Sequence, residues 1–387
     1  MKKIAIIGGG RCAEIFAIHA HKMGIETHCF SLEKGIVNKL AFDYLHFVNI
    51  LNRDEVLSIC KEIGIDAIVA TTELTIAVVA YVAEKLKLNA IPLDTAEKIT
   101  DKYHNRVITE KIEDLAKPKY KEVNTIDEIK ESHFDFPIIL KPTAKGGKRG
   151  VVVVNKIEDL DESFEYALNG AGGQLPIIVE EFIDGGMECS VESLSYKGKN
   201  YIIQVTQKCT SGAPHCVELA HHQPANISKE IRNKVEHIVD EILTKLGIEY
   251  GPAHTEIKIK DNKVYLIECN ARPGGDHIAY PLTILSTGYD YFKGAIEIAL
   301  DEFKGIDTAK LLSNASGVVF VTNHTKEYEN LFNNVEKYEW CYKKNFVSNK
   351  LQTIEHNDGC NINYFIYNAK EKPNFEDLIE RENNGNR

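Results

Sequence analysis

Residues 254–275 read HTEIKIKDNKVYLIECNARPGG, two runs of alternating apolar and polar side chains separated by Asp261-Asn262-Lys263. This pattern predicts a β-hairpin that closes at a three-residue loop. The register gathers four apolar side chains on one buried face, pairing Ile257 with Ile267 and Ile259 with Tyr265. Glu256 then lies directly opposite Glu268, whereas a two-residue turn would put these two glutamates on opposite faces.

The polar face of this hairpin has the side chains of a metal site. Asn270 shares a face with Glu268 because side chains in a strand alternate with a period of two. Two carboxylates and an amide oxygen are hard ligands that suit Mg²⁺, with Mn²⁺ as an alternative. The competing interpretation is a solvated strand face, with Lys258 and Lys260 as neighbours. The arginine and two glycines that follow Asn270 favour the metal site, since a solvated face would not require them.

A second segment, upstream of the hairpin, has the composition of a phosphate-binding loop. Lys141 ends the apolar run 137–140, and the stretch 143–150, TAKGGKRG, follows before another apolar run. Three glycines and three cations between two strands can lay backbone N–H groups and positive charge over a polyphosphate. The stretch lacks the G-x-x-x-x-G-K-[ST] pattern of a Walker A loop. The alternative is an ordinary flexible hairpin.

The N-terminal residues 1–93 alternate short apolar runs with helical stretches, which predicts a doubly wound parallel sheet. The expected strands are Lys3–Ile7, Glu26–Phe30, Tyr44–Val48, Ala67–Ala70 and Leu88–Ile91. The turn Gly8–Ala13 fits G-x-G-x-x-A, a dinucleotide fingerprint, with Glu33 as a loosely placed acidic partner. The alternative is a tight turn whose helix N-terminus attracts anions.

The remaining chain divides into a longer and a shorter part. Residues 94–304 contain the two motifs above, a long hairpin at 188–208 and a helix between Ser228 and Gly247. Single helices are expected over 94–112 and 281–300. Residues 305–387 predict a small β-rich C-terminal domain, with strands near 317–322 and 362–367.

Composition narrows the class of protein. The 387 residues carry a formal charge of −11, so nucleic acid and anionic membranes are not expected as partners. The apolar runs are too short for a signal peptide or a membrane span. Nine cysteines without a C-x-x-C pair predict reduced thiols and no zinc framework. We therefore expect a soluble, cytoplasmic protein that acts on small molecules, with a homodimer as one option for its assembly.

Taken in order, these motifs resemble the ATP-grasp superfamily of carboxylate–amine ligases, over about residues 1–305. The resemblance implies an N-terminal Rossmann-like domain (1–93) and a two-lobed ATP-grasp domain (94–182 and 183–304). It implies ATP and Mg²⁺ as cofactors. The ATP contacts that it implies are Lys102, Lys141, Lys145, Gly146, Gly147, Glu180, Glu181, Ile183 and Glu188. Either Glu180 or Glu181 would hold adenine. Glu256, Glu268 and Asn270 match the metal ligands, while Arg272 and Lys141 match the catalytic cations.

Within the superfamily, residues 218–224 and 251–258 look most like the L-amino-acid ligases, which join two amino acids through an acyl phosphate. By its E-x-x-H-x-x-P spacing His221, rather than His222, would lie in the substrate pocket. Arg272 and Gly275 would lie there too. The chain departs from that pattern at Ala220 and at Asp276-His277, so the resemblance leaves the identity of the amino acids open.

The sequence thus predicts an ATP- and Mg²⁺-dependent ligase that forms an amide or peptide bond, between small amino acids, through an acyl phosphate. One alternative is a purine-type or carboxylase-like enzyme of the same superfamily. Another is a Rossmann oxidoreductase that uses NAD(P) at Gly8–Ala13. A third is a nucleotide-binding protein without activity, against which the carboxylate pair and Arg272 argue.

Overall fold

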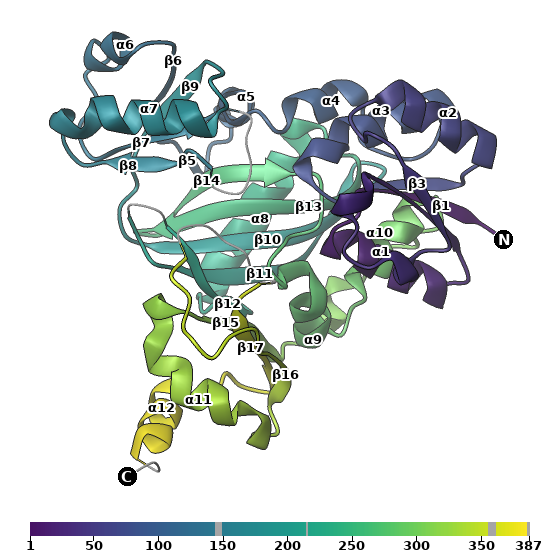
Figure 1. The fold of residues 1–387 in the computed structure, drawn as a ribbon. Coiled ribbons are helices and arrows are strands. Elements are labelled where there is room, and N and C mark those ends of the chain that lie inside the picture. The colour runs from purple at the N-terminus through teal and green to yellow at the C-terminus, as the bar shows by residue number, and fades with distance from the viewer. Residues whose placement is uncertain (144–148, 214–215, 355–360, 385–387) are drawn as a thin grey trace.

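A computed structural model describes residues 1–143, 149–213, 216–354 and 361–384 (Figure 1). The N-terminal unit has a four-stranded parallel sheet in the order β3-β2-β1-β4. Its elements are β1 (Lys3–Ile7), α1 (Arg11–Lys22), β2 (Glu26–Ser31), β3 (Tyr44–Phe47), α2 (Arg53–Ile63), β4 (Ala67–Ala70) and α3 (Ile76–Leu86). Helices cover both faces, so the predicted doubly wound sheet is confirmed. The expected strand Leu88–Ile91 is wrong, because these residues leave the sheet and lead to the next helix.

A small lobe follows, with an antiparallel sheet in the order β6-β9-β7-β8. Its elements are α4 (Leu93–Lys98), α5 (Lys102–Thr109), β6 (Tyr120–Val123), α6 (Ile126–Lys130), β7 (Ile138–Pro142), β8 (Val152–Val154), α7 (Leu160–Gly170) and β9 (Ile177–Glu181). Helices α6 and α7 cover this sheet (Figure 1). The expected helix over 94–112 is two helices, because Asp101 accepts from the His104 backbone N–H (2.9 Å) and caps a new one.

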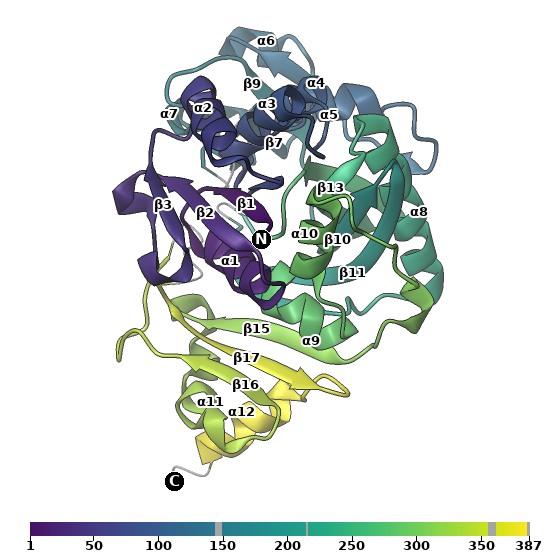
Figure 2. The same cartoon turned by 90° about the vertical axis from the view of Figure 1, so that its right-hand side faces the viewer.

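The largest sheet has nine strands in the order β16-β17-β15-β12-β11-β10-β13-β14-β5. Its elements before residue 305 are the edge strand β5 (Leu115–Ala116) and then β10 (Met187–Tyr196), β11 (Lys199–Thr210), β12 (Glu218–Gln223), α8 (Lys229–Leu246), β13 (Tyr250–Lys260) and β14 (Lys263–Asn270). Helix α8 runs from its Ser228 cap to Gly247, as predicted, and packs its apolar stripe on one face of β10 and β11 (Figure 2). The opposite face is left for polar side chains.

The C-terminal segment continues this same sheet. Its elements are β15 (Ala315–Val321), α11 (Glu329–Asn334), β16 (Cys341–Asn345), β17 (Asn363–Ala369) and α12 (Phe375–Asn384). Strand β15 pairs with β12, so the proposed boundary near residue 305 crosses a continuous sheet. Beyond it, α11 and α12 build a core of their own on β15 and β17.

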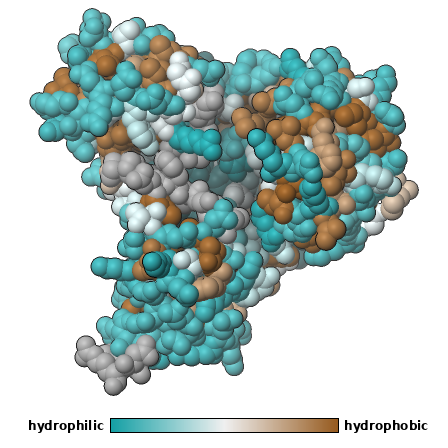
Figure 3. Space-filling view, in the orientation of Figure 1, coloured by the Kyte–Doolittle hydropathy of each residue, from teal (hydrophilic) through white to brown (hydrophobic). Residues whose placement is uncertain are grey.

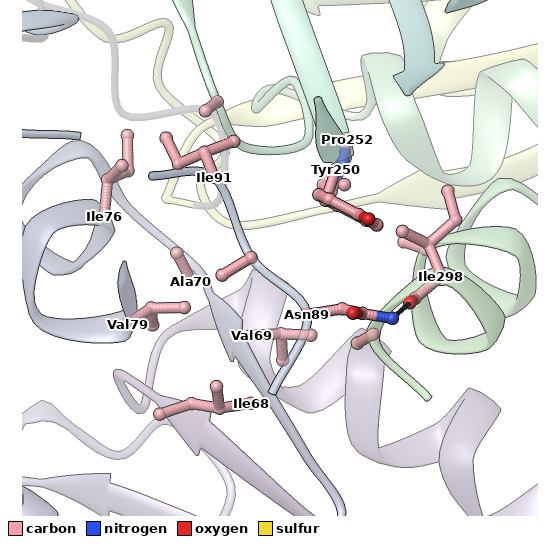
Figure 4. Close-up of a pocket in the computed structure, with 15 residues that line it drawn as sticks. Ile68, Val69, Ala70, Ile76, Val79, Asn89, Ile91, Tyr250, Pro252 and Ile298 are labelled. Atoms are coloured by element: carbon pink, nitrogen blue, oxygen red, sulfur yellow. Dashed lines mark hydrogen bonds between the residues drawn. The ribbon is translucent and has the colours of Figure 1, made fainter. Parts of the chain in front are cut away.

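The N-terminal unit is fixed to the large sheet through α1 and α10 (Tyr291–Ala299). The expected helix over 281–300 is broken into α9 (Thr283–Thr287) and α10, because Gly288 adopts a left-handed conformation with φ 72°. Next to α10 a small, mainly apolar cavity of about 50 Å³ lies at this junction, and Asn89 donates to the Ile298 carbonyl there (3.2 Å; Figure 4). This cavity is too small and too apolar for a nucleotide.

Candidate active site

A cavity of about 230 Å³ lies where the small lobe, the large sheet and the N-terminal unit meet. Figure 3 shows a hydrophilic hollow between the α6–α7 lobe and the N-terminal unit. Most of the predicted site residues line the cavity: Lys102, Lys141, Glu180, Glu181, Ile183, Glu188, His221, Glu256, Glu268, Arg272 and Gly275. Asn270 is buried beside Glu268 and does not line it. Lys145, Gly146 and Gly147 fall outside the described residues.

The hairpin puts its glutamates side by side by a different route from the one predicted. Its turn has two residues, Asp261 and Asn262, both with positive φ. Ile257 pairs with Leu266, and a bulge then makes Ile267 an extra residue, so that Glu256 still faces Glu268. The prediction of which residues of the second strand form the buried apolar face was therefore wrong. Val264 and Leu266 are buried with Ile257 and Ile259, whereas Tyr265 and Ile267 line the cavity.

Each of the two glutamates has a cationic neighbour. Glu256 accepts from Lys208 Nζ (2.7 Å), and Glu268 lies 3.2 Å from Lys102 Nζ. Asn270 Nδ2 donates to Glu268 Oε1 (3.0 Å), which fixes that carboxylate. Within the described ranges no group of three or more His, Cys, Asp or Glu side chains is gathered for a metal. Two carboxylates are nevertheless the set that Mg²⁺ takes when phosphate oxygens and water complete its shell, so the residues fit this ion.

Lys208 was not predicted, although it ends the expected strand of the long hairpin. It is 7% exposed, and its Nζ also lies 3.0 Å from Glu218 and 3.5 Å from Glu188. Burial lowers the pKa of Lys208, but the carboxylates raise it more, so that the pKa lies well above its usual range. The amine is therefore a permanent cation among three glutamates.

A second cluster lies in the small lobe around Glu180. Arg106 donates to both oxygens of Glu180 (2.6 and 3.1 Å), and Lys141 donates to the second of these oxygens. Burial alone would raise the pKa of Glu180. Arg106 and Lys141 lower it by more than burial raises it, so that the pKa is about 2. Glu181 points to solvent and accepts from the Lys119 backbone (3.3 Å). Glu180 is thus held in an ion-pair network, and the backbone from Glu181 onward lines the cavity.

We expect Lys141→Ala to raise the KM for ATP and to lower kcat, with little change in Tm. Lys141 lines the cavity, and Glu180 would keep Arg106 as its partner, which protects the fold. ADP binding by calorimetry and steady-state kinetics measure the effect. Lys156→Ala, at a lysine whose side chain is 64% exposed, is the matched control. Unchanged nucleotide binding would show that Lys141 only balances Glu180.

Arg272 binds a residue that the sequence did not single out. Glu73, which begins a short turn of helix after β4, accepts from Arg272 Nη2 across the junction with the N-terminal unit. Both side chains line the cavity. Burial raises the pKa of Glu73, but Arg272 lowers it below its usual range, so the carboxylate is ionised. The pairing holds the guanidinium at the cavity wall, where charge on a transferred phosphate could be met.

The two neighbouring histidines face opposite sides of the sheet. His221 is completely buried, lines the cavity and meets the ring of Phe320 edge-on (5.7 Å between centroids). His222 instead bonds the Tyr367 hydroxyl (3.0 Å) in the C-terminal core, where burial lowers its pKa to about 3. His221 therefore lines the cavity and His222 does not, while a role for His221 in binding the substrate stays a prediction.

The glycine turn after β1 does not offer room for a dinucleotide. A side chain at Gly9 would meet the Gly35 carbonyl oxygen at 2.8 Å, and the Gly9 carbonyl accepts from Val37 N–H (2.9 Å). The backbone of residues 35–37 therefore covers the turn where a pyrophosphate would lie. Glu33 is exposed and bonds Lys39 (2.6 Å). This geometry argues against the oxidoreductase interpretation.

Residues 134–280 match the family model described as the ATP-grasp domain. The chain contains an ATP-grasp domain. The ATP-grasp match spans β7 to β14, and so includes the predicted phosphate loop and both hairpin glutamates. Together with the similar enzymes described next, this match bears out the predicted ATP-dependent ligase, with ATP and Mg²⁺ as its cofactors. No helix in the described part of the chain is long and apolar enough to cross a membrane.

Similar proteins agree on the ATP-grasp fold and differ in substrate. The formate-dependent phosphoribosylglycinamide formyltransferase of Saccharolobus solfataricus is 25% identical, covering 87% of this chain and 85% of its own. The enzyme of the same name from Sulfurisphaera tokodaii is 27% identical with the same coverage. An L-amino acid ligase structure from Bacillus licheniformis superposes with a TM-score of 0.81 at 20% identity, covering 99% and 97%. N5-carboxyaminoimidazole synthetase from Staphylococcus aureus, with ADP, gives 0.78 at 15%, covering 98% and 96%.

Proposed function

We propose that this chain is a purine-type carboxylate–amine ligase. It uses ATP to activate a small carboxylate and transfers the acyl group to the amine of a phosphorylated acceptor. The purine-type alternative is preferred over the expected amino-acid ligase because the similar formyltransferases align over most of both chains. The single structural observation that carries the proposal is a second cavity beside the first.

This second cavity, of about 210 Å³, offers a place for an anionic acceptor. Arg11 at the start of α1 and Lys343 of β16 both line it, and the helix N-terminus adds partial positive charge. Gly275 and Asp276 line both cavities, so an acceptor bound in the second could present its amine to the first. A phosphate at the cationic end and an amine near the Asp276 carboxylate would suit these charges.

The reaction has two steps. A carboxylate oxygen attacks the γ-phosphorus of ATP, and the bond to the β-phosphate oxygen breaks, releasing ADP and leaving an acyl phosphate. The amine nitrogen then attacks the acyl carbon, phosphate leaves, and the nitrogen loses a proton as the amide forms. When bound, Mg²⁺ would supply charge neutralisation for the phosphates, held by Glu256 and Glu268.

The remaining requirements fall to residues of the chain. Bringing a carboxylate to a triphosphate joins two anions, so Lys102, Lys141 and Arg272 neutralise charge around the reacting groups. The buried ion pair of Lys141 with Glu180 and the partly buried ion pair of Arg272 with Glu73 hold these cations in place before substrate arrives. An acyl phosphate hydrolyses in water, and a cavity between three structural units can exclude it.

ADP release tests the proposal directly. We expect turnover with formate and phosphoribosylglycinamide, the substrates after which the similar enzymes are named, and less with an acceptor that lacks its phosphate. Pairwise mixtures of amino acids form the second arm. ADP release with amino acids alone would overturn the purine-type proposal in favour of the amino-acid ligase, for which the position of His221 in the cavity speaks.

His221→Ala should change which carboxylates support ADP release, while ATP affinity stays within a few-fold. His221 lines the cavity from β12, opposite Lys208 of β11, and we assign it to the substrate and not to ATP. A hydrogen bond to a charged group is worth about 1.5–3 kcal/mol, or roughly ten- to 150-fold in turnover. His222→Ala is the control, expected to lower Tm without changing selectivity. Identical substrate profiles for wild type and His221→Ala would show that His221 does not contribute to substrate selection.

A further inference from the structure

Glu192 lies in the middle of β10 and is completely buried. Its two oxygens have different partners. Oε1 bonds His254 Nδ1, while Oε2 accepts from the Gly274 backbone N–H (3.0 Å). A buried carboxylate is costly unless both oxygens are satisfied, so its presence requires these two contacts. Neither partner is close to Glu192 in the sequence, and no sequence motif singles this glutamate out.

The first contact leads to the proposed metal carboxylates. His254 is 3% exposed, and its Nε2 lies 3.2 Å from Glu256 Oε1. The imidazole therefore bridges Glu192 and Glu256, and its ring orientation is fixed from both sides. Lys208 holds the same Glu256 oxygen from the other direction (2.7 Å). The position of the Glu256 carboxylate thus depends on a chain of contacts that ends at Glu192.

The second contact leads to Arg272. Gly274 lies two residues after Arg272, in the loop that follows β14. A side chain at Gly274 would meet Glu192 Oε1 at 2.7 Å, Oε2 at 2.9 Å and His254 Nδ1 at 2.7 Å, so this backbone sits directly on the pair. Arg272 also donates to the Pro273 carbonyl (2.8 Å), which ties its side chain to the same loop. A shift of Glu192 would therefore be passed to the arginine.

We propose that Glu192 is a positioning residue that sets two parts of the ligase site at once, the Glu256 carboxylate through His254 and the Arg272 loop through Gly274. The inference rests on the roles proposed above for Glu256 and Arg272, and not on the identity of the acceptor. A residue that only filled space on β10 would be apolar, like the buried Leu194 two residues further along the same strand. An ionised group with two directed contacts fixes geometry as well as volume.

Glu192→Gln tests this role with little change in size. An amide offers one oxygen and one NH₂, so it cannot accept from both His254 and Gly274. Partners that orient metal ligands typically cost 10- to 100-fold in activity or metal affinity when removed, and we expect a fall in kcat of that size. The KM for ATP should stay within a few-fold. The Mg²⁺ concentration needed for half-maximal ADP binding, measured by calorimetry, should rise by about tenfold.

Two further variants keep the test decisive. Gly274→Ala disturbs the same contact from the loop side, and should give the same fall in kcat and the same rise in Mg²⁺ requirement. It takes the place of Glu192→Gln as the test if that variant does not fold. The double variant should lose no more activity than the more affected single variant, because both substitutions break the same contact between Glu192 and Gly274. Ser193→Ala, at a buried polar residue on the same strand, is the control for damage to β10.

Wild-type Mg²⁺ dependence of ADP binding in folded Glu192→Gln or Gly274→Ala would overturn the inference. Equal losses in Ser193→Ala would also overturn it, because the effect would then belong to the strand. The calorimetric measurement needs neither formate nor an acceptor. If the purine-type proposal failed in the ADP-release assay, the calorimetric result would therefore still test the role of Glu192.

Discussion

Glu268→Gln will nearly abolish ATP-dependent turnover while the protein stays folded. We expect kcat to fall at least about a hundredfold, which corresponds to ~2.7 kcal/mol of lost transition-state stabilisation. Glutamine keeps the shape of the side chain and removes the negative charge that would balance the metal. The Glu268 side chain is 18% exposed and lines the cavity, so its loss leaves no hole in the core. Phosphate release at millimolar Mg²⁺ measures the effect, and circular dichroism with Tm checks the fold.

A matched control is Glu230→Gln, at an exposed glutamate in the first turn of α8. It changes the net charge equally, so a general electrostatic effect would appear in both variants. Phosphate release by Glu268→Gln at the wild-type rate would contradict the role proposed for Glu268. It would also reduce the hairpin to a solvated strand face, the alternative that the sequence left open.

Local pattern was enough to predict the hairpin and its two glutamates, but not the register beyond them. The alternation of side chains does not show a bulge, and the extra residue Ile267 restores the pairing that a two-residue turn would otherwise lose. Asp261-Asn262 fits the positive φ of a tight turn, and this signal was available in the sequence. The pairing of Glu256 with Glu268 was thus right, while the apolar face assigned to Tyr265 was wrong.

Contacts made across the fold could not be predicted from spacing. Glu73 reaches Arg272 from the other structural unit, 199 residues away, and Arg106 meets Glu180 across 74 residues. Neither glutamate lies in a motif that predicts such a partner. A buried cation such as Lys208 looks like any strand-end lysine in the sequence. Only the topology, with β12, β11, β10 and β13 side by side, shows that it serves three carboxylates.

Lys208→Met will destabilise the protein more than any other single change considered above. Removing one member of a buried ion pair typically costs 3–5 kcal/mol. We expect about 3 kcal/mol, at the low end, because the Glu188 and Glu256 side chains are each 15% exposed and keep some contact with solvent. Methionine fills the volume of the lysine stem, so the loss reports the charge and not a cavity. Lys199→Met, at an exposed lysine of the same strand, is the control.

The pH dependence of this loss identifies its cause. The raised pKa of Lys208 means that its positive charge is fully present at and below neutral pH and is lost only as the pH rises through that folded-state pKa. In the variant, three carboxylates face one another without a cation, and proton uptake relieves their repulsion. The difference in Tm between wild type and Lys208→Met should therefore be smaller at pH 5 than at pH 8, and Mg²⁺ with ADP should reduce it at pH 8. A difference in Tm that is the same at both pH values would show that Lys208 contributes by packing alone.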